Sequence, residues 1–157
     1  MAEYLYHYTG CGLDYVYLAN GFEERETPFG RGVAIHDLDG LHTAIATDLV
    51  NNKPNWTGAE LRFIRKELGF TQQRLGEFVG RSSQSVALWE KEKQKIPPAV
   101  TNIVRGIYKS RIDGNVQFEM LLERINDLDR QLNDLQKKIA YRVDGVEGVG
   151  WHADMVA

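Results

Sequence analysis

The sequence predicts an α+β protein with a small N-terminal β-rich domain, a central all-α helix-turn-helix domain and a long C-terminal amphipathic helix. Tyrosines that alternate with other residues near the start have the two-residue period of a strand. Short apolar runs separated by helix caps and glycines follow, and then leucine and isoleucine recur at intervals of three and four. We expect boundaries at 1–53, 57–111 and 114–142, with a tail over 143–157.

The segment over residues 3–36 predicts a small sheet or a pair of hairpins. Asn20-Gly21 is a strong hairpin turn pair. Gly30-Arg31-Gly32 predicts a second turn, after which Val33 and Ile35 form a short strand. Apolar residues at helical spacing then predict a helix over residues 38–51. The helix is expected to end near Asn51-Asn52-Lys53-Pro54, which also serves as a linker.

The middle segment predicts four short helices whose first residues are recognisable. Thr57 and Glu60 form a capping box, in which each side chain accepts a hydrogen bond from a backbone N–H that the first turn leaves unpaired. Thr71 and Ser82 have the residue type of N-caps for the second and third helices, and Pro97-Pro98 begins the fourth.

The second and third of these helices meet the requirements of a helix-turn-helix. Because the two helices cross closely, one residue of the first helix must be very small, and Gly76 meets this requirement. The turn needs a residue that tolerates a positive φ, which Gly80 supplies. Four apolar positions fix the angle between the helices: Leu75, Val79, Val86 and Trp89.

The stretch from Leu61 to Ile107 resembles the Xre/Cro repressor-type helix-turn-helix family over about a third of the chain. The resemblance implies that Arg65 pairs with Glu90 and that Gln72 contacts a DNA phosphate. The whole chain also resembles bacterial antitoxin-type regulators of the MqsA kind, in which a small N-terminal domain precedes this fold. Those regulators bind zinc through several N-terminal cysteines, whereas this chain has only Cys11, so we expect no zinc site.

The third helix is expected to lie in the major groove with its first turn against the base edges. Gln84 is the best candidate for reading a base, because a carboxamide pairs with both N6 and N7 of adenine. Leu88 suits contact with a thymine methyl group. The full base-reading set is Ser83, Gln84, Ser85 and Leu88, and the phosphate-binding set is Gln72, Gln73, Arg81, Lys91, Lys93 and Lys95.

The charge distribution fits a polyanionic ligand although the whole chain has a net charge of −3. Residues 57–111 contain 11 Lys and Arg against 5 Asp and Glu, a net charge of +6. The segments before and after them carry −5 and −4. Because salt screens charges beyond about 10 Å, the local field decides attraction to nucleic acid.

The C-terminal helix has apolar residues at a heptad spacing, which predicts packing against a second copy. Docking of the same stripe on the protein's own core is the alternative. The residues of this expected dimer seam are Phe118, Leu121, Ile125, Leu128, Leu132, Leu135 and Ile139.

Several functional classes are not expected. His7, Cys11, His36 and His42 match no standard metal-ligand spacing, and there is no glycine-rich phosphate loop or nucleophile motif. We therefore predict no enzyme, cofactor or metal. A run of about 18 apolar residues, which a membrane span requires, is missing, and no secretory signal opens the sequence, so we expect a cytoplasmic, nucleoid-associated protein of bacterial or phage type.

These observations predict a homodimeric, sequence-specific regulator of transcription that binds double-stranded DNA at an inverted repeat. Repression would follow from occupying a promoter, and activation through the acidic flanks is the variant. One alternative is an antitoxin-like autorepressor that binds a partner protein through its N-terminal domain. The other is an interaction adaptor that keeps the helical fold without using DNA.

Overall fold

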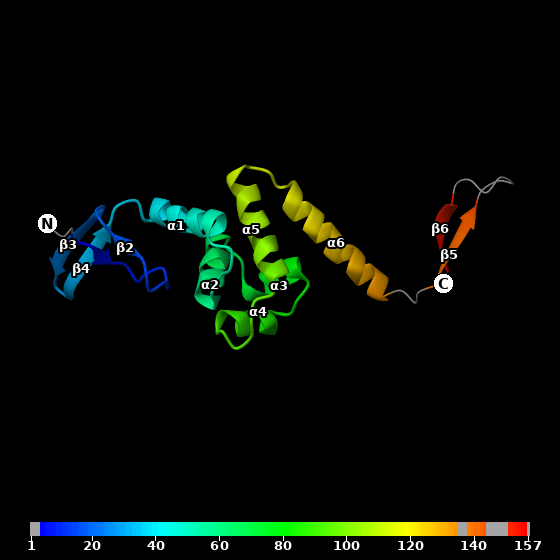
Figure 1. Ribbon diagram of the computed structural model, residues 1–157, viewed down its shortest axis with the longest axis horizontal. Coiled ribbons are helices and arrows are strands. Elements are labelled where there is room, and N and C mark those ends of the chain that lie inside the picture. Colours follow the sequence, from blue (N-terminus) through cyan, green and yellow to red (C-terminus); the bar gives the residue numbers. More distant parts are fainter. Residues whose placement is uncertain (1–3, 135–137, 144–150, 157) are drawn as a thin grey trace. The chain divides into compact units, whose positions relative to one another are not determined.

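The computed structural model describes residues 4–134, 138–143 and 151–156 (Figure 1). Its α+β class agrees with the prediction: short strands come first, helices follow, and two further strands come after the helices. The chain divides into two compact units, Met1–Glu119 and Met120–Ala157. The first unit contains β1 (Tyr6–His7), β2 (Tyr17–Leu18), β3 (Phe22–Thr27), β4 (Gly30–Ile35), α1 (Leu38–Asn52), α2 (Gly58–Glu67), α3 (Gln72–Val79), α4 (Ser83–Glu90), α5 (Pro98–Ile112) and the start of α6 (Gln117–Asp134).

The N-terminal strands form two antiparallel pairs, β1 with β2 and β3 with β4. The predicted turn at Gly30-Arg31-Gly32 is wrong, because these residues lie inside β4. The chain reverses at Pro28-Phe29 instead, where the Thr27 hydroxyl donates to the carbonyl of Gly30 at 2.6 Å and accepts from the Phe29 N–H. Proline and a hydroxyl that bonds the local backbone are typical of a tight turn.

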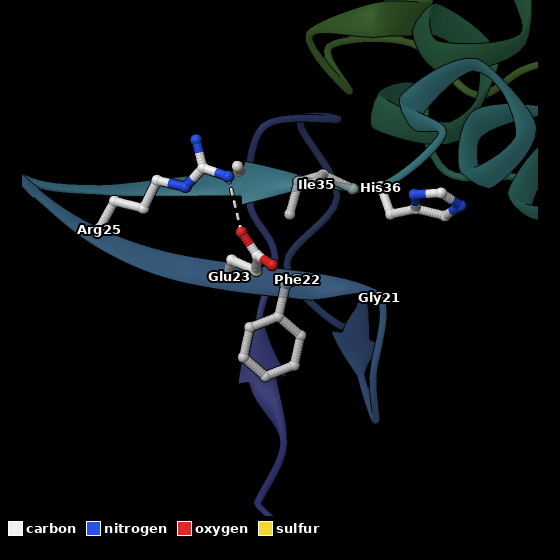
Figure 2. A pocket seen from close by; sticks show the side chains of 7 residues that line it. Gly21, Phe22, Glu23, Arg25, Ile35 and His36 are labelled. Carbon is white, nitrogen blue, oxygen red and sulfur yellow. Dashed lines mark hydrogen bonds and ion pairs between the residues drawn. The ribbon is translucent and has the colours of Figure 1, made fainter.

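A cavity of about 460 Å³ lies along the β3–β4 hairpin (Figure 2). It is open to solvent and has both apolar and charged walls. Phe22 and Ile35 supply apolar surface, and Glu23 and Arg25, both on β3, line the cavity and form an exposed ion pair at 2.7 Å. The Phe29 side chain at the hairpin tip is 99% exposed.

The core of the first unit lies among α2, α3, α4 and α5. Leu61, Ile64, Leu75, Val86 and Ile107 are fully buried there. The predicted caps are confirmed: Thr57 and Glu60 form the capping box of α2, and the hydroxyls of the N-cap residues accept from the backbone at α3 and α4. These caps fix where each short helix begins.

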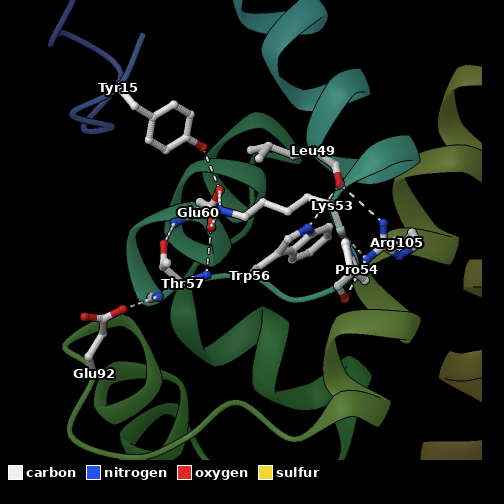
Figure 3. Close-up of polar contacts among 10 residues, drawn as sticks. Tyr15, Leu49, Lys53, Pro54, Trp56, Thr57, Glu60, Glu92 and Arg105 are labelled. Carbon is white, nitrogen blue, oxygen red and sulfur yellow. Dashed lines mark hydrogen bonds and ion pairs between the residues drawn. The ribbon is translucent and has the colours of Figure 1, made fainter.

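Arg105 on α5 holds the end of α1 and the linker that follows it (Figure 3). Its guanidinium donates to the carbonyls of Leu49 and Val50, and also to those of Lys53 and Pro54. The same group lies over the Trp56 ring, 5.0 Å from its centroid. One side chain thus satisfies carbonyls that the last turn of a helix leaves unpaired.

Two tyrosines join the N-terminal strands to the helices. The Tyr8 hydroxyl shares a hydrogen bond of 2.7 Å with Nε2 of His42 on α1. Nδ1 of the same imidazole lies 3.1 Å from the Glu67 carboxylate of α2. The hydroxyl of Tyr15 donates to Glu60 at 2.6 Å. The β segment is therefore fastened near both ends of α2.

The second unit contains the rest of α6 and an antiparallel hairpin of β5 (Lys138–Val143) and β6 (Trp151–Val156). The expected helix over 114–142 is shorter, because α6 ends at Asp134 and Ile139 lies in β5, paired with Met155. Residues 138–143 include two β-branched residues and a tyrosine, residue types that favour a strand. None of the described helices is long and apolar enough to span a bilayer.

Candidate nucleic-acid interface

α3 and α4 form the predicted helix-turn-helix, with a close approach at Gly76. A Cβ added to Gly76 would lie 2.5 Å from the carbonyl oxygen of Arg81, so only glycine fits between α3 and the residue before the N-cap of α4. Gly80 ends α3 with a φ of 68°, the left-handed conformation predicted for it. Leu75, Val86 and Trp89 are buried, and Val79 is half-buried.

The end of α4 is anchored by a buried ion pair between Arg65 and Glu90. The Arg65 guanidinium donates to both carboxylate oxygens of Glu90 and to the Phe70 carbonyl at 2.8 Å. The two charged side chains are only 10% and 5% exposed. Gln72 joins them, because its amide nitrogen donates to Glu90 at 2.8 Å. The contact of Gln72 with a DNA phosphate stays a prediction.

A second close approach was not predicted from the sequence. A Cβ on Gly58, the first residue of α2, would overlap the backbone carbonyls of Trp89 and Glu90. The Gly58 N–H donates to the carboxylate of Glu92, which lies just after α4 with a positive φ of 58° (Figure 3). The start of α2 therefore packs directly on the end of α4. A glycine after an N-cap threonine gives no sequence signal for this role.

The first turn of α4 presents short polar side chains. Gln84 is exposed, whereas Ser83, Ser85 and Leu88 are half-buried. The hydroxyl of Ser82 accepts from the Ser85 N–H and lies 3.2 Å from the Ser85 hydroxyl. Gln84 is thus the base-reading candidate with the most accessible side chain.

Exposed basic residues stand at both ends of α4. Arg81 precedes the helix, and Lys91, Lys93 and Lys95 follow it in the loop before α5; Gln73 on α3 is exposed as well. Three other cations of this basic segment have internal partners: Arg65 pairs with Glu90, Arg105 holds α1, and Arg111 pairs with Glu119. Among the described residues, the exposed cations that flank α4 in sequence are therefore Arg81, Lys91, Lys93 and Lys95.

The loop after α4 also borders a cavity of about 310 Å³. Trp56 and Trp89 supply its apolar wall, and Lys93 and Lys95 line it from the loop. The N-terminal turn of α2, which starts after Thr57, completes the lining. Backbone and basic side chains here extend the polar surface beyond α4.

Behind this surface, the Glu60 carboxylate is fully buried and has several donors (Figure 3). Lys53 donates to both of its oxygens at 2.7 Å, and the Thr57 N–H and Tyr15 hydroxyl donate to it as well. Burial alone would raise the pKa of Glu60, but these hydrogen bonds outweigh it and lower that pKa. Burial and the bond to Glu60 raise the pKa of Tyr15.

The expected dimer seam is divided by the structure. The Phe118 ring lies against Gly106 of α5 and so packs within its own unit. Leu121, Ile125 and Leu128 are exposed on α6. Leu132 is helical but its side chain lies outside the described residues, as does all of Leu135, and Ile139 belongs to β5.

Among the described residues, histidine, cysteine and carboxylates form no cluster suited to a metal ion. His7 instead contacts the carbonyl of Asp14, and the Cys11 thiol lies 4.0 Å from the carbonyl of Leu13.

Comparisons of the chain with protein-family models, with curated proteins and with solved structures gave no match.

Proposed function

We propose that the protein is a sequence-specific, double-stranded DNA-binding regulator of transcription that acts as a homodimeric repressor on an inverted repeat. The observation that carries this proposal is the first turn of α4. It exposes Gln84 between Arg81 on one side and the lysines of the following loop on the other. Small polar side chains suit base edges, and exposed cations at both helix ends suit the two flanking phosphate chains.

The packing behind α4 supports the same function. A helix that reads base edges must keep its angle to the body of the domain, because an error of about an ångström moves an amide out of hydrogen-bond range. The close approach at Gly76 and the buried Arg65–Glu90 pair fix the two ends of α4. The resemblance to Xre/Cro-type regulators rests on these same residues.

Selection of DNA from a random pool with the purified protein, read for half-site spacing, tests the proposal. We expect an inverted repeat with half-sites about 34 Å apart, one turn of DNA. Fluorescence anisotropy on the selected and a random duplex should then show a difference in affinity that persists at two salt concentrations. Equal binding to both duplexes would overturn sequence specificity, and no binding would favour the adaptor.

Gln84→Ala tests the base-reading role. Specific affinity should fall by about 1–3 kcal/mol while affinity for random DNA changes little. Gln117→Ala is the matched control, because it removes an exposed glutamine at the start of α6. An equal loss on all DNA would contradict the role of Gln84.

A partner protein at the N-terminal segment is the second candidate function, in the manner of an antitoxin-like autorepressor. It is favoured by the β3–β4 hairpin, whose tip exposes Phe29 almost completely and whose open cavity has apolar walls at Phe22 and Ile35. Phe29→Ala should then abolish recovery of a specific partner from cells and leave affinity for the selected DNA unchanged. Unchanged recovery would rule out this hairpin as the contact.

A further inference from the structure

The exposed face of α6 is a stripe of large apolar side chains. Leu121, Ile125 and Leu128 are 54%, 45% and 47% exposed, at spacings of four and three. Side chains at these spacings lie on one side of a helix. A stripe this narrow is the width that one partner helix covers, whereas docking on a globular core uses a wider apolar face.

The residue types along this stripe favour one kind of partner. If Phe118 takes heptad position a, then Ile125 is also at a, and Leu121 and Leu128 are at d. Within the exposed stripe, the a residue is the β-branched Ile125 and both d residues are leucine. This combination favours a parallel coiled coil of two helices over larger helical bundles. Phe118 packs on Gly106 in its own unit, so the available stripe begins at Leu121.

The charges beside the stripe favour the same orientation. Arg124 is at position g and Asp129 is at position e of the next heptad. In a parallel pair, a g residue of one helix faces the following e residue of the other, so Arg124 would meet Asp129 twice by symmetry. In an antiparallel pair, g faces g, which sets Arg124 against itself or Gln131.

We propose that α6 pairs with α6 of a second copy of this chain as a parallel, in-register, two-stranded coiled coil that begins at Leu121. This proposal names the surface through which the homodimer of the proposed function would form, and its biological role rests on that proposed function. The contact itself requires no DNA. Its test can therefore fail or succeed independently of DNA binding.

Disulfide cross-linking tests the orientation in the full chain. Cys11→Ser removes the native thiol, and Leu121→Cys and Leu128→Cys are then introduced one at a time. In a parallel, in-register pair, equivalent d positions lie within the 4.4–6.8 Å between Cα atoms that a disulfide needs. We expect both variants to form a covalent dimer under mild oxidation, about tenfold or more faster than the control Met120→Cys. Met120 is 62% exposed and is adjacent in sequence to Leu121, at position c.

The outcomes separate the possible arrangements. An antiparallel pair brings an equivalent residue together only near its centre, so cross-linking at one d position but not the other would overturn the parallel arrangement. Cross-linking no faster than at Met120, with a monomeric mass by light scattering, would overturn the dimer. Dimer formation without recognition of any DNA would leave this contact intact and overturn the proposed function instead.

A charge exchange gives a second test that leaves the apolar stripe unaltered. Arg124→Glu should lower the dimer fraction at a fixed protein concentration, because it faces Asp129 of the partner in the parallel pair. The double variant with Asp129→Arg should restore it. No change in the single variant, or no recovery in the double, would contradict the parallel register.

Discussion

α4 and α6 both leave one face uncovered, and the two faces have opposite chemistry. α4 exposes Gln84 between basic residues, whereas α6 exposes Leu121, Ile125 and Leu128. Burying an apolar stripe away from water lowers the free energy of the system, so such a stripe favours contact with another protein surface. A polar face with flanking cations favours binding to a polyanion such as nucleic acid, because the binding releases the counterions of the phosphates. The comparison teaches that one chain can place a polar, cationic face and an apolar face on separate helices, which the proposed function would use for nucleic acid and for protein.

The two helices also differ in how they are anchored. α4 is anchored to the body of the first unit through buried Val86 and Trp89 and through the Glu90 carboxylate at its end. α6 is fixed within the first unit at its start, where Phe118 packs on Gly106 and Glu119 pairs with Arg111 at 2.6 Å. Changes in the body of the first unit should therefore affect α4 first.

The largest effect is expected from Glu90→Ala. It leaves the Arg65 guanidinium buried without its carboxylate, which should lower the free energy of unfolding by about 3–5 kcal/mol. Urea denaturation followed by circular dichroism measures this loss. Glu77→Ala, which removes the exposed partner of Arg74, should cost less than about 1 kcal/mol. Equal losses in the two variants would contradict the structural role given to Glu90.

Gly76→Ala should have the next largest effect. The added methyl group would meet the Arg81 carbonyl oxygen at 2.5 Å, so α3 and α4 must move apart, at a cost of about 1–3 kcal/mol. Affinity for the selected DNA should fall at temperatures where the variant is still folded, while cross-linking through Leu128→Cys persists. Loss of both together would show that α4 and α6 are not independent surfaces.

Neutralising the loop after α4 should change DNA binding alone. Lys93→Gln with Lys95→Gln should reduce the slope of log affinity against log salt by about two, one for each phosphate that the protein no longer neutralises. Anisotropy titrations at several salt concentrations measure the slope. Lys109→Gln, on the last turn of α5, is the control and should leave it unchanged. A slope that does not change would remove these lysines from the interface.

The smallest effect is expected from pH. The folded state lowers the pKa of Glu60, so this carboxylate stabilises the fold above the unfolded pKa of about 4.5, and the contribution is lost as pH falls through the lower folded value. The free energy of unfolding should therefore decline as pH falls below about 5, and less steeply in Glu60→Gln. Cross-linking through α6 should be independent of this group.

Features that depend on neighbours in sequence could be predicted. The caps at Thr57, Thr71 and Ser82, and the positive φ of Gly80, follow from short-range hydrogen bonding and sterics, and each is present. The close approach at Gly76 was also predictable, because the helix-turn-helix pattern requires a small residue there. The candidate base-reading helix therefore could be found from the sequence.

Features that join distant parts of the chain could not be predicted. Tyr15 and Glu60 are 45 residues apart, and Arg105 reaches carbonyls more than 50 residues earlier. No local pattern marks such partners. The end of α6 was misplaced for a related reason: Ile139 continues the heptad spacing, but the structure places it in β5, where it pairs with Met155 more than ten residues later.

One buried carboxylate ties three segments into a single cooperative element. Glu60 caps its own helix, neutralises Lys53 of the linker and accepts the Tyr15 hydroxyl. Detaching the N-terminal strands would leave that buried oxygen with fewer donors and loosen the first turn of α2 at the same moment. Amide hydrogens in both places should accordingly exchange with solvent through one shared opening event, with one common free energy of opening.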